Sequence, residues 1–232
     1  MNENLKTNFK AFFQEFSSYC SAKNSNAKLL AVSKTMPLSD IVALTEEGQK
    51  MYGENYAQEL RDKSLENQNN QAQDIEWHYI GQIQKNKIKY IVGTAKLIHT
   101  VDSYEKAKII SEISEKKILQ QNILLQVNIS EDSNKAGVPA TDLKYLIPKI
   151  KSLGSIKLDG LMTITENFND PEKSRDCYRK MKALGQDFAD SFDKERHDLS
   201  MGMSNDYKVA IDEGATIVRI GTKIFGKRKK IL

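Results

Sequence analysis

The sequence predicts a closed (β/α)8 TIM barrel preceded by one extra helix, and two observations support this fold. The chain has 232 residues, which is close to the usual size of such a barrel and enough to bury a full core. Short apolar runs alternate with longer segments of helical periodicity, as in βαβ units with a parallel sheet. The eight predicted strands cover residues 28–34, 51–55, 76–81, 97–101, 123–129, 157–163, 198–201 and 216–220.

An open, doubly wound sheet is the alternative fold, because it also alternates strands with helices and periodicity does not show closure. Eight strand–helix units favour the closed barrel. No linker, solenoid repeat or low-complexity stretch divides the chain, so a single domain is expected over residues 1–232. Residues 68–73 (QNNQAQ) are the most polar stretch and predict a surface loop.

The extra helix near the amino terminus carries an aromatic stripe that is typical of core packing. The stripe consists of Leu5, Phe9, Phe12, Phe13, Phe16 and Tyr19. Further helices are predicted at residues 104–117, 141–153 and 171–192 and near 206–213. Pro148 lies inside one of them, so that helix is expected to kink or to start late. Asp170 is a suitable N-cap residue, and Pro171 suits a first helical turn.

Composition and the amino terminus indicate a globular, cytoplasmic protein. Hydrophobic residues make up 39% and charged residues 28% of the chain, without the bias of a disordered segment. No apolar run reaches the roughly 18 residues that a membrane-spanning helix needs, and residues 1–5 (MNENL) lack the features of a signal peptide. Cys20 and Cys177 form no Cys-x-x-Cys pair, so neither a disulfide framework nor a thiolate metal site is expected.

The net charge of +4 is a mild excess that partly reflects the basic segment 227–230 (KRKK). A solvated tail is the expected role of this segment, because no aromatic residues interleave with its charges as in single-strand binding surfaces. Neither nucleic acid nor a membrane is therefore an expected partner.

Lys34 ends the first predicted strand and is a candidate for covalent chemistry. In parallel α/β barrels the active site lies at the carboxyl ends of the strands. A buried lysine loses part of its solvation, which lowers its pKa and frees the amine to attack a carbonyl. Lys34 could therefore anchor a phosphorylated aldehyde cofactor, although a lysine that leaves a strand for solvent would produce the same pattern.

Two segments rich in glycine and hydroxyl groups follow the last two predicted strands, where barrels commonly bind phosphate. They are residues 199–204 (LSMGMS) and 219–226 (RIGTKIFG). Gly202 and Gly221 would let backbone N–H groups approach an anion closely. Hydroxyl donors come from Ser200, Ser204 and Thr222. The start of the helix after Ser204 could add its own N–H groups, and two ordinary Gly/Ser turns are the alternative interpretation.

Arg219 interrupts an otherwise apolar strand, TIVRIG over residues 216–221. A charge in such a run is costly unless it is paired or bound. If Arg219 faces the barrel mouth, it could donate to a pyridine nitrogen and keep that nitrogen unprotonated. The alternative is a structural ion pair with Glu54 or Asp159.

The remaining polar candidates have weaker support. Asn55 could orient a ring hydroxyl or cap the following helix. His78 is expected to be a satisfied core histidine or a hydrogen-bond donor behind the site. His99 and His197 have no metal-ligand spacing relative to His78, so no metal site is expected.

These residues resemble the pyridoxal 5′-phosphate (PLP) homeostasis proteins over nearly the whole chain. The matching segments are AVSKT (31–35), GENY (53–56), WHYIG (77–81), QKNK (84–87), QVNI (126–129), KAG (135–137), GLM (160–162), LSMGMS (199–204), VRIGT (218–222) and IFG (224–226). The chain departs from the family pattern little, at Met36, Ile83 and Lys85.

The resemblance implies a PLP-binding barrel like the N-terminal domain of alanine racemases, with PLP held as a Schiff base on Lys34. It further implies that Arg219 faces the pyridine nitrogen of the cofactor. The phosphate would be held by Gly221, Thr222 and the loop from Ser200 through Met201 to Ser204.

The resemblance also implies control of PLP supply rather than a defined reaction. The sequence ends at Leu232, directly after the eighth predicted strand, without the further β domain that completes the active site and the dimer of barrel-type racemases. A monomeric carrier that hands PLP to apo enzymes is therefore the first hypothesis. A weak amino-acid racemase or other PLP enzyme is the second, and a cofactor-free Schiff-base aldolase is the third.

Overall fold

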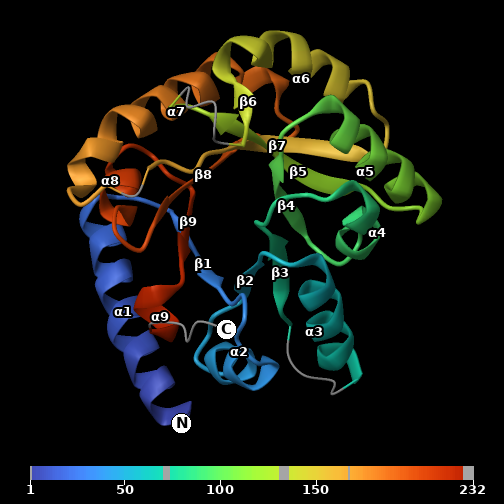
Figure 1. Cartoon of the computed structure of the whole chain (residues 1–232). Helices are drawn as coiled ribbons and strands as arrows, with labels where there is room; N and C mark the ends of the chain where they lie inside the picture. The colour runs from blue at the N-terminus through green and yellow to red at the C-terminus, as the bar shows by residue number, and fades with distance from the viewer. Residues whose placement is uncertain (1, 70–73, 131–135, 167, 227–232) are drawn as a thin grey trace.

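A closed parallel barrel forms the centre of the computed structural model, which describes residues 2–69, 74–130, 136–166 and 168–226 (Figure 1). Neighbouring barrel strands pair in parallel, and pairing between β4 and β5 closes the ring. This pairing confirms the predicted barrel over the open sheet. The barrel strands are β1 (Lys28–Val32), β2 (Met51–Glu54), β3 (Glu76–Tyr79), β4 (Leu97–Val101), β5 (Gln121–Asn128), β7 (Ile156–Met162), β8 (Asp198–Met203) and β9 (Ile217–Ile220).

The strand predictions differ from the structure mainly at strand ends. Strand β1 ends two residues earlier than predicted, so Lys34 lies in the turn that follows it. A ninth strand, β6 (Val138–Pro139), pairs only with β5 and stays outside the ring. It was not predicted because two residues are too short to show a period.

The helices lie outside the ring of strands (Figure 1), and α1 packs against α2 and α9. The α-helices are α1 (Asn2–Ala22), α2 (Leu38–Thr45), α3 (Ala57–Asn69), α4 (Ile88–Ile91), α5 (Tyr104–Lys116), α6 (Leu143–Lys151), α7 (Arg175–Asp187), α8 (Tyr207–Asp212) and α9 (Thr222–Phe225). The extra amino-terminal helix is thus confirmed, and within its stripe Phe9, Phe12 and Phe16 are buried whereas Phe13 stays exposed.

The helix predicted over residues 171–192 is interrupted. A 3₁₀ turn, η3 (Pro171–Ser174), precedes α7, and a second turn, η4 (Ala189–Ser191), follows it. Asp170 accepts a hydrogen bond from the Glu172 N–H as predicted. Pro148 is accommodated inside α6, which starts late after the short turn η2 (Ala140–Asp142).

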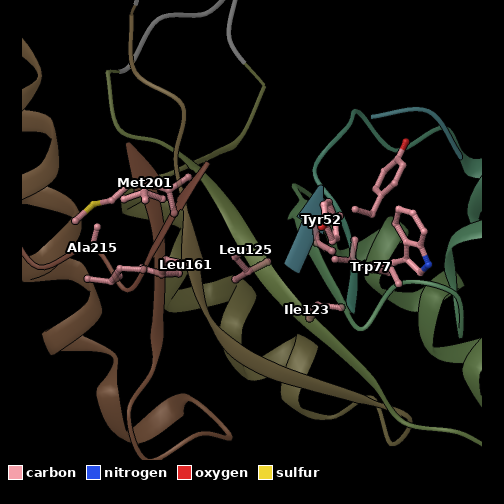
Figure 2. Close-up of a cluster of buried hydrophobic side chains, with 14 of the residues drawn as sticks. Tyr52, Trp77, Ile123, Leu125, Leu161, Met201 and Ala215 are labelled. Carbon is pink, nitrogen blue, oxygen red and sulfur yellow. The ribbon is translucent and has the colours of Figure 1, made fainter. Parts of the chain in front are cut away.

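The core has two layers because successive side chains of a strand point to opposite faces. The outer layer lies between strands and helices and includes the labelled side chains of Figure 2. Those are Tyr52, Trp77, Ile123, Leu125, Leu161, Met201 and Ala215. An inner cluster inside the ring contains Leu30, Leu97, Leu124, Met162 and Ile217. These apolar side chains share the barrel interior with buried polar side chains, among them His78, His99 and Ser200.

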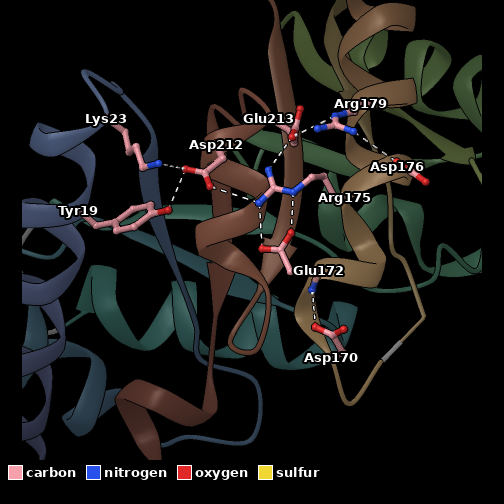
Figure 3. Close-up of polar contacts among 9 residues, drawn as sticks. All are labelled: Tyr19, Lys23, Asp170, Glu172, Arg175, Asp176, Arg179, Asp212 and Glu213. Carbon is pink, nitrogen blue, oxygen red and sulfur yellow. Dashed lines mark hydrogen bonds and ion pairs between the residues drawn. The ribbon is translucent and has the colours of Figure 1, made fainter.

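A network of ion pairs joins α7, α8 and α1 on the outside of the barrel (Figure 3). Arg175 donates to Glu213 at 2.6 Å and to Asp212 at 3.5 Å. Asp212 also accepts the Tyr19 hydroxyl at 2.8 Å and pairs with Lys23 at 3.0 Å. These contacts fix the extra helix against the last helical layer.

Two predictions fall wholly or partly outside the described residues. Helix α3 extends through Asn69, so residues 68 and 69 are helical rather than part of the predicted loop at 68–73, and residues 70–73 lie outside the description. The basic segment 227–230 also lies outside it. Within the residues the structure does describe, no helix has the length and apolarity needed to cross a membrane.

Candidate functional site

A cavity of about 700 Å³ opens at the carboxyl ends of β1, β2, β8 and β9. This is the end of the barrel at which the sequence predicted a site. Six of the eight predicted site residues line the cavity. They are Lys34, Asn55, Ser204, Arg219, Gly221 and Thr222.

The turn that carries Lys34 is held in a strained conformation. Thr35 has a φ of 66°, which is unfavourable for a β-branched residue. Its N–H donates to Glu59 Oε1 at 2.6 Å, and the Met36 N–H donates to the Ser33 carbonyl at 3.0 Å. Such strain persists only where surrounding contacts impose it, so these contacts fix the backbone beside Lys34.

Lys63 of α3 contacts this turn and helps to hold its backbone in place. Its ammonium group lies 2.9 Å from the Ser33 carbonyl and 2.8 Å from Glu54 Oε1. It also lies 2.7 Å from Glu59 Oε1, so its three N–H donors have three acceptors. Burial raises the pKa of Glu54, and the nearby Lys63 opposes that rise. Lys63 was not predicted as part of the site, because a lysine in a polar helix is normally exposed.

Arg219 forms part of the cavity wall and is only 4% exposed. One guanidinium nitrogen donates to Ser200 Oγ at 2.8 Å, and the other donates to the Thr163 carbonyl at 2.8 Å. Burial lowers the pKa of Arg219 to about 10, which leaves it cationic at neutral pH. The positive charge of Arg219 is therefore buried beside the cavity, and its hydrogen-bond partners are neutral.

The ion pair considered for Arg219 is not formed with either candidate carboxylate in the described structure. Glu54 is engaged by Lys63 and by the Ser33 hydroxyl. Asp159 accepts from Asn122 Nδ2 at 2.6 Å. This leaves the Arg219 charge available to a ligand in the cavity.

The loop after β8 is tightly folded beside the cavity. Asp206 Oδ1 accepts the Met203 N–H at 2.7 Å, and its other oxygen accepts the Tyr178 hydroxyl at 2.6 Å. Gly202 has a φ of +90°, and a Cβ there would lie 2.5 Å from the Ala210 side chain. The loop thus has a fixed shape that a larger residue at position 202 would disturb.

Hydroxyl and N–H groups converge at the same corner of the cavity. Ser204 Oγ accepts the Gly221 N–H at 3.4 Å, and Thr222 begins α9 with an exposed side chain. Asn55 adds a buried Oδ1 atom that has no hydrogen-bond partner among the described residues. Together with the basic residues Lys34 and Arg219, these hydroxyl and N–H groups suit an anionic ligand.

Ser200 and Met201 are the two predicted site residues whose side chains do not line the cavity. The Ser200 side chain is fully buried inside the ring and bonds Arg219. The Met201 side chain points outward into the core between strands and helices (Figure 2). The alternation of side chains along β8 separates the two, so neither side chain is part of the cavity lining, and their role in phosphate binding stays a prediction.

His78 and His99 lie inside the ring as hydrogen-bonded partners. His78 Nδ1 is 2.8 Å from His99 Nε2, and His99 Nδ1 is 2.9 Å from Ser200 Oγ. Burial lowers the pKa of His78 to about 3, and that of His99 well below its usual value. Among the described residues no cluster of side chains could hold a metal ion.

Comparison with known proteins shows which family the chain belongs to. Residues 6–229 match the family model described as "Alanine racemase, N-terminal domain". A pyridoxal phosphate homeostasis protein of Aquifex aeolicus is 42% identical over 205 residues, which cover 88% of each chain. The chain belongs to the pyridoxal phosphate homeostasis protein family. Another member, from Vibrio cholerae, is 38% identical over 90% of this chain and 89% of its own.

Solved structures agree with this family assignment. PipY of Synechococcus elongatus, in a structure with PLP bound, is 31% identical with a TM-score of 0.77. The match covers 87% of this chain and 93% of PipY. Alanine racemase of Clostridium difficile is 15% identical with a TM-score of 0.71 over 99% of this chain and 58% of its own. That last likeness concerns the fold alone.

Proposed function

We propose that this protein binds PLP in the cavity, holds it as a Schiff base on Lys34 and releases it to other proteins without turnover. The observation that carries the proposal is the meeting of Lys34 and the buried Arg219 charge in one cavity. Membership of the homeostasis family supports it, as does the relative PipY with PLP bound.

The residues at the cavity fit such a cofactor. When bound, PLP supplies an aldehyde that condenses with an amine to a Schiff base and releases water. Ser204, Gly221 and Thr222 would hold the phosphate through hydroxyl and N–H donors. The Asn55 side chain would meet the ring hydroxyl, with its buried Oδ1 atom as acceptor.

Arg219 would donate to the pyridine nitrogen. A guanidinium group has donors only and stays charged at neutral pH, since its lowered pKa is still about 10. It therefore cannot protonate the ring nitrogen in the way that a carboxylic acid could. An unprotonated ring is a weaker electron sink, which suits storage better than carbanion chemistry.

The acid–base groups of the cavity also favour a carrier. Of the described residues in the lining, only Lys34, Asp206 and Arg219 can titrate. Asp206 is engaged with the Tyr178 and Ser174 hydroxyls and the Met203 N–H. Proton transfer on both faces of a substrate needs two free groups, and this set does not provide them.

Borohydride trapping followed by peptide mapping tests the anchor. We expect reduction of the PLP-loaded protein to leave a pyridoxyl group on the peptide with Lys34, and Lys34→Ala to abolish it. Lys223→Ala is the matched control, because Lys223 is an exposed lysine next to Thr222. Labelling scattered over surface lysines would overturn the proposal. Exchange of an amino acid's α-deuteron at enzyme-like rates would replace the carrier with a PLP enzyme.

A further inference from the structure

A continuous chain of side chains crosses the barrel interior beneath Arg219. It runs from Arg219 on β9 to Ser200 on β8, then to His99 on β4 and His78 on β3. The three hydrogen-bond lengths are 2.8, 2.9 and 2.8 Å. The members are at most 4% exposed, so solvent does not compete for these bonds.

The donors in this chain have one consistent direction. A guanidinium group has donors only, so Ser200 Oγ accepts from Arg219. The single hydroxyl proton of Ser200 is then free to be donated to His99 Nδ1. With Nδ1 as acceptor, the neutral His99 ring carries its proton on Nε2 and donates it to His78 Nδ1. The His78 ring in turn carries its proton on Nε2.

The opposite direction is less favourable. If His99 Nδ1 donated to Ser200, the serine oxygen would receive two donors. The hydroxyl proton of Ser200 would then have no acceptor among the residues that the structure describes. A buried donor without an acceptor costs free energy. The forward direction moves that unmatched donor to His78 Nε2, which has no partner among the described residues.

The far end of the hydrogen-bonded chain, at His78, lies beside a second cavity with polar walls. His78 lines a second cavity, of about 270 Å³, at the amino ends of the strands. Lys28, Glu76, Lys96 and Asp198 line the same cavity. The Nε2 atom itself is buried without a described partner, so the forward direction leaves one unmatched group, whereas the reverse direction would leave two, the Ser200 proton and the His78 Nε2 lone pair. The chain thus links the floor of the upper cavity with the opposite mouth of the barrel.

We propose that His99 and His78 are positioning residues for Arg219. Through Ser200 they hold an acceptor lone pair against the guanidinium group, which fixes the group without a carboxylate. A carboxylate would fix it equally well but would cancel its positive charge. The neutral side chains therefore fix Arg219 without an ion pair among the described residues, and the carboxylate of Asp206, which also lines the cavity, acts on its charge only from a distance. The effect of this arrangement on cofactor binding rests on the proposed function, whereas the hydrogen-bonded chain of Arg219, Ser200, His99 and His78 does not depend on it.

The pKa shifts of the two histidines support this arrangement. Burial lowers both pKa values, and His78 and Arg219 lower that of His99 further. A proton on either ring would place a second cation near Arg219 in the interior. The rings therefore stay neutral at physiological pH, as the directed chain requires.

Nitrogen-15 NMR of the histidine rings in the apo protein tests the direction. We expect both His78 and His99 to be neutral and protonated on Nε2 at pH 7. A proton on His99 Nδ1 would overturn the directed chain. This measurement uses no cofactor, so it stands even if PLP does not bind at Lys34.

Substitution of His99 tests the positioning role. We expect His99→Leu to increase exchange and rotation of the Arg219 guanidinium in apo-protein NMR. We also expect it to weaken PLP binding up to about tenfold, the upper end of what a neutral hydrogen bond contributes, and to shift the absorbance of the bound cofactor. His99→Asn should restore these properties, because its amide oxygen can occupy the position of Nδ1.

Two further variants complete the test. His197→Leu is the matched control, because His197 is partly exposed and lies outside the chain. Ser200→Ala removes the hydroxyl acceptor that faces Arg219 directly, and it serves as the test if His99→Leu does not fold. Unchanged guanidinium mobility together with unchanged PLP affinity in the folded variants would overturn the proposal.

Discussion

Two buried cations, Lys63 and Arg219, lie on opposite faces of the barrel wall and differ in their partners. Lys63 is 7% exposed and contacts two carboxylates, Glu54 and Glu59. Arg219 is 4% exposed and donates to a serine hydroxyl and a backbone carbonyl. A buried charge costs several kcal/mol unless it is compensated. Lys63 is compensated within the fold, whereas Arg219 keeps its charge for a ligand.

The difference shows how similar burial can serve two roles. The carboxylates around Lys63 hold the turn beside Lys34 in place, so the charge there serves the structure. The neutral partners of Arg219 fix the position of the group and leave its electrostatic potential at the cavity. The four predictions below test this comparison.

The largest effect is expected for Lys63→Met. Removing the ammonium group leaves the buried Glu54 without its cation, which typically costs about 3–5 kcal/mol of unfolding free energy. Denaturant unfolding of the apo protein measures this loss. The double variant Lys63→Met/Glu54→Gln should recover part of it, because no buried charge then remains unpaired. A loss below about 1 kcal/mol would mean that Lys63 is not a structural cation.

Acid should destabilise the Arg219 region through its histidines. The pKa of His78 is about 3 when folded and about 6.5 when unfolded. Between these values the unfolded chain binds more protons, so stability is complete above pH 6.5 and is lost as pH falls. The slope is at most about 1.4 kcal/mol per pH unit for this histidine. Urea unfolding from pH 7 to 4 should give a shallower slope for His78→Gln, and an unchanged slope would contradict this.

Arg219→Met should change apo stability by only about 1 kcal/mol in either direction. No carboxylate loses its partner, and replacing a buried charge by an apolar side chain of similar volume is often neutral. The same variant should alter the absorbance and affinity of bound PLP. Thermal unfolding measures the change in stability, and PLP titration measures the change in affinity and absorbance. A loss as large as that of Lys63→Met would mean that Arg219 is primarily structural.

The smallest effect is expected at the network of Figure 3. Arg175 is partly exposed, and its partners include the exposed Glu172. Such pairs contribute about 0.2–1 kcal/mol each and weaken with salt. Arg175→Ala should therefore lower stability by roughly 1 kcal/mol at low salt and less in 1 M NaCl. A loss that does not depend on salt would point to packing of the arginine stem instead.

Much of the fold could be predicted from the local pattern. The alternation of strand and helix periodicity predicted all eight barrel strands, with ends no more than two residues from the observed ones. The end of α7 at Asp187 was not predicted, because the apolar spacing of Leu184, Phe188 and Phe192 continues through it. Arg219 stood out because it interrupts an apolar run, and burying a charge is costly enough to be conspicuous in a strand. Lys34 stood out as the charge after an apolar run, and it lies half-buried in the turn that follows β1.

The sequence by itself determined the barrel, the end that carries the site and six of the residues that line the cavity. Only the tertiary structure decided which groups are partners. His99 and Ser200 are 101 residues apart, and Lys63 reaches Ser33 across 30 residues. Such contacts depend on ring closure and strand register. A register change between β8 and β9 helps place Ser200 beneath Arg219, and side-chain alternation turns Met201 outward. Local periodicity sets which face a side chain takes, but the closed ring sets what it meets there.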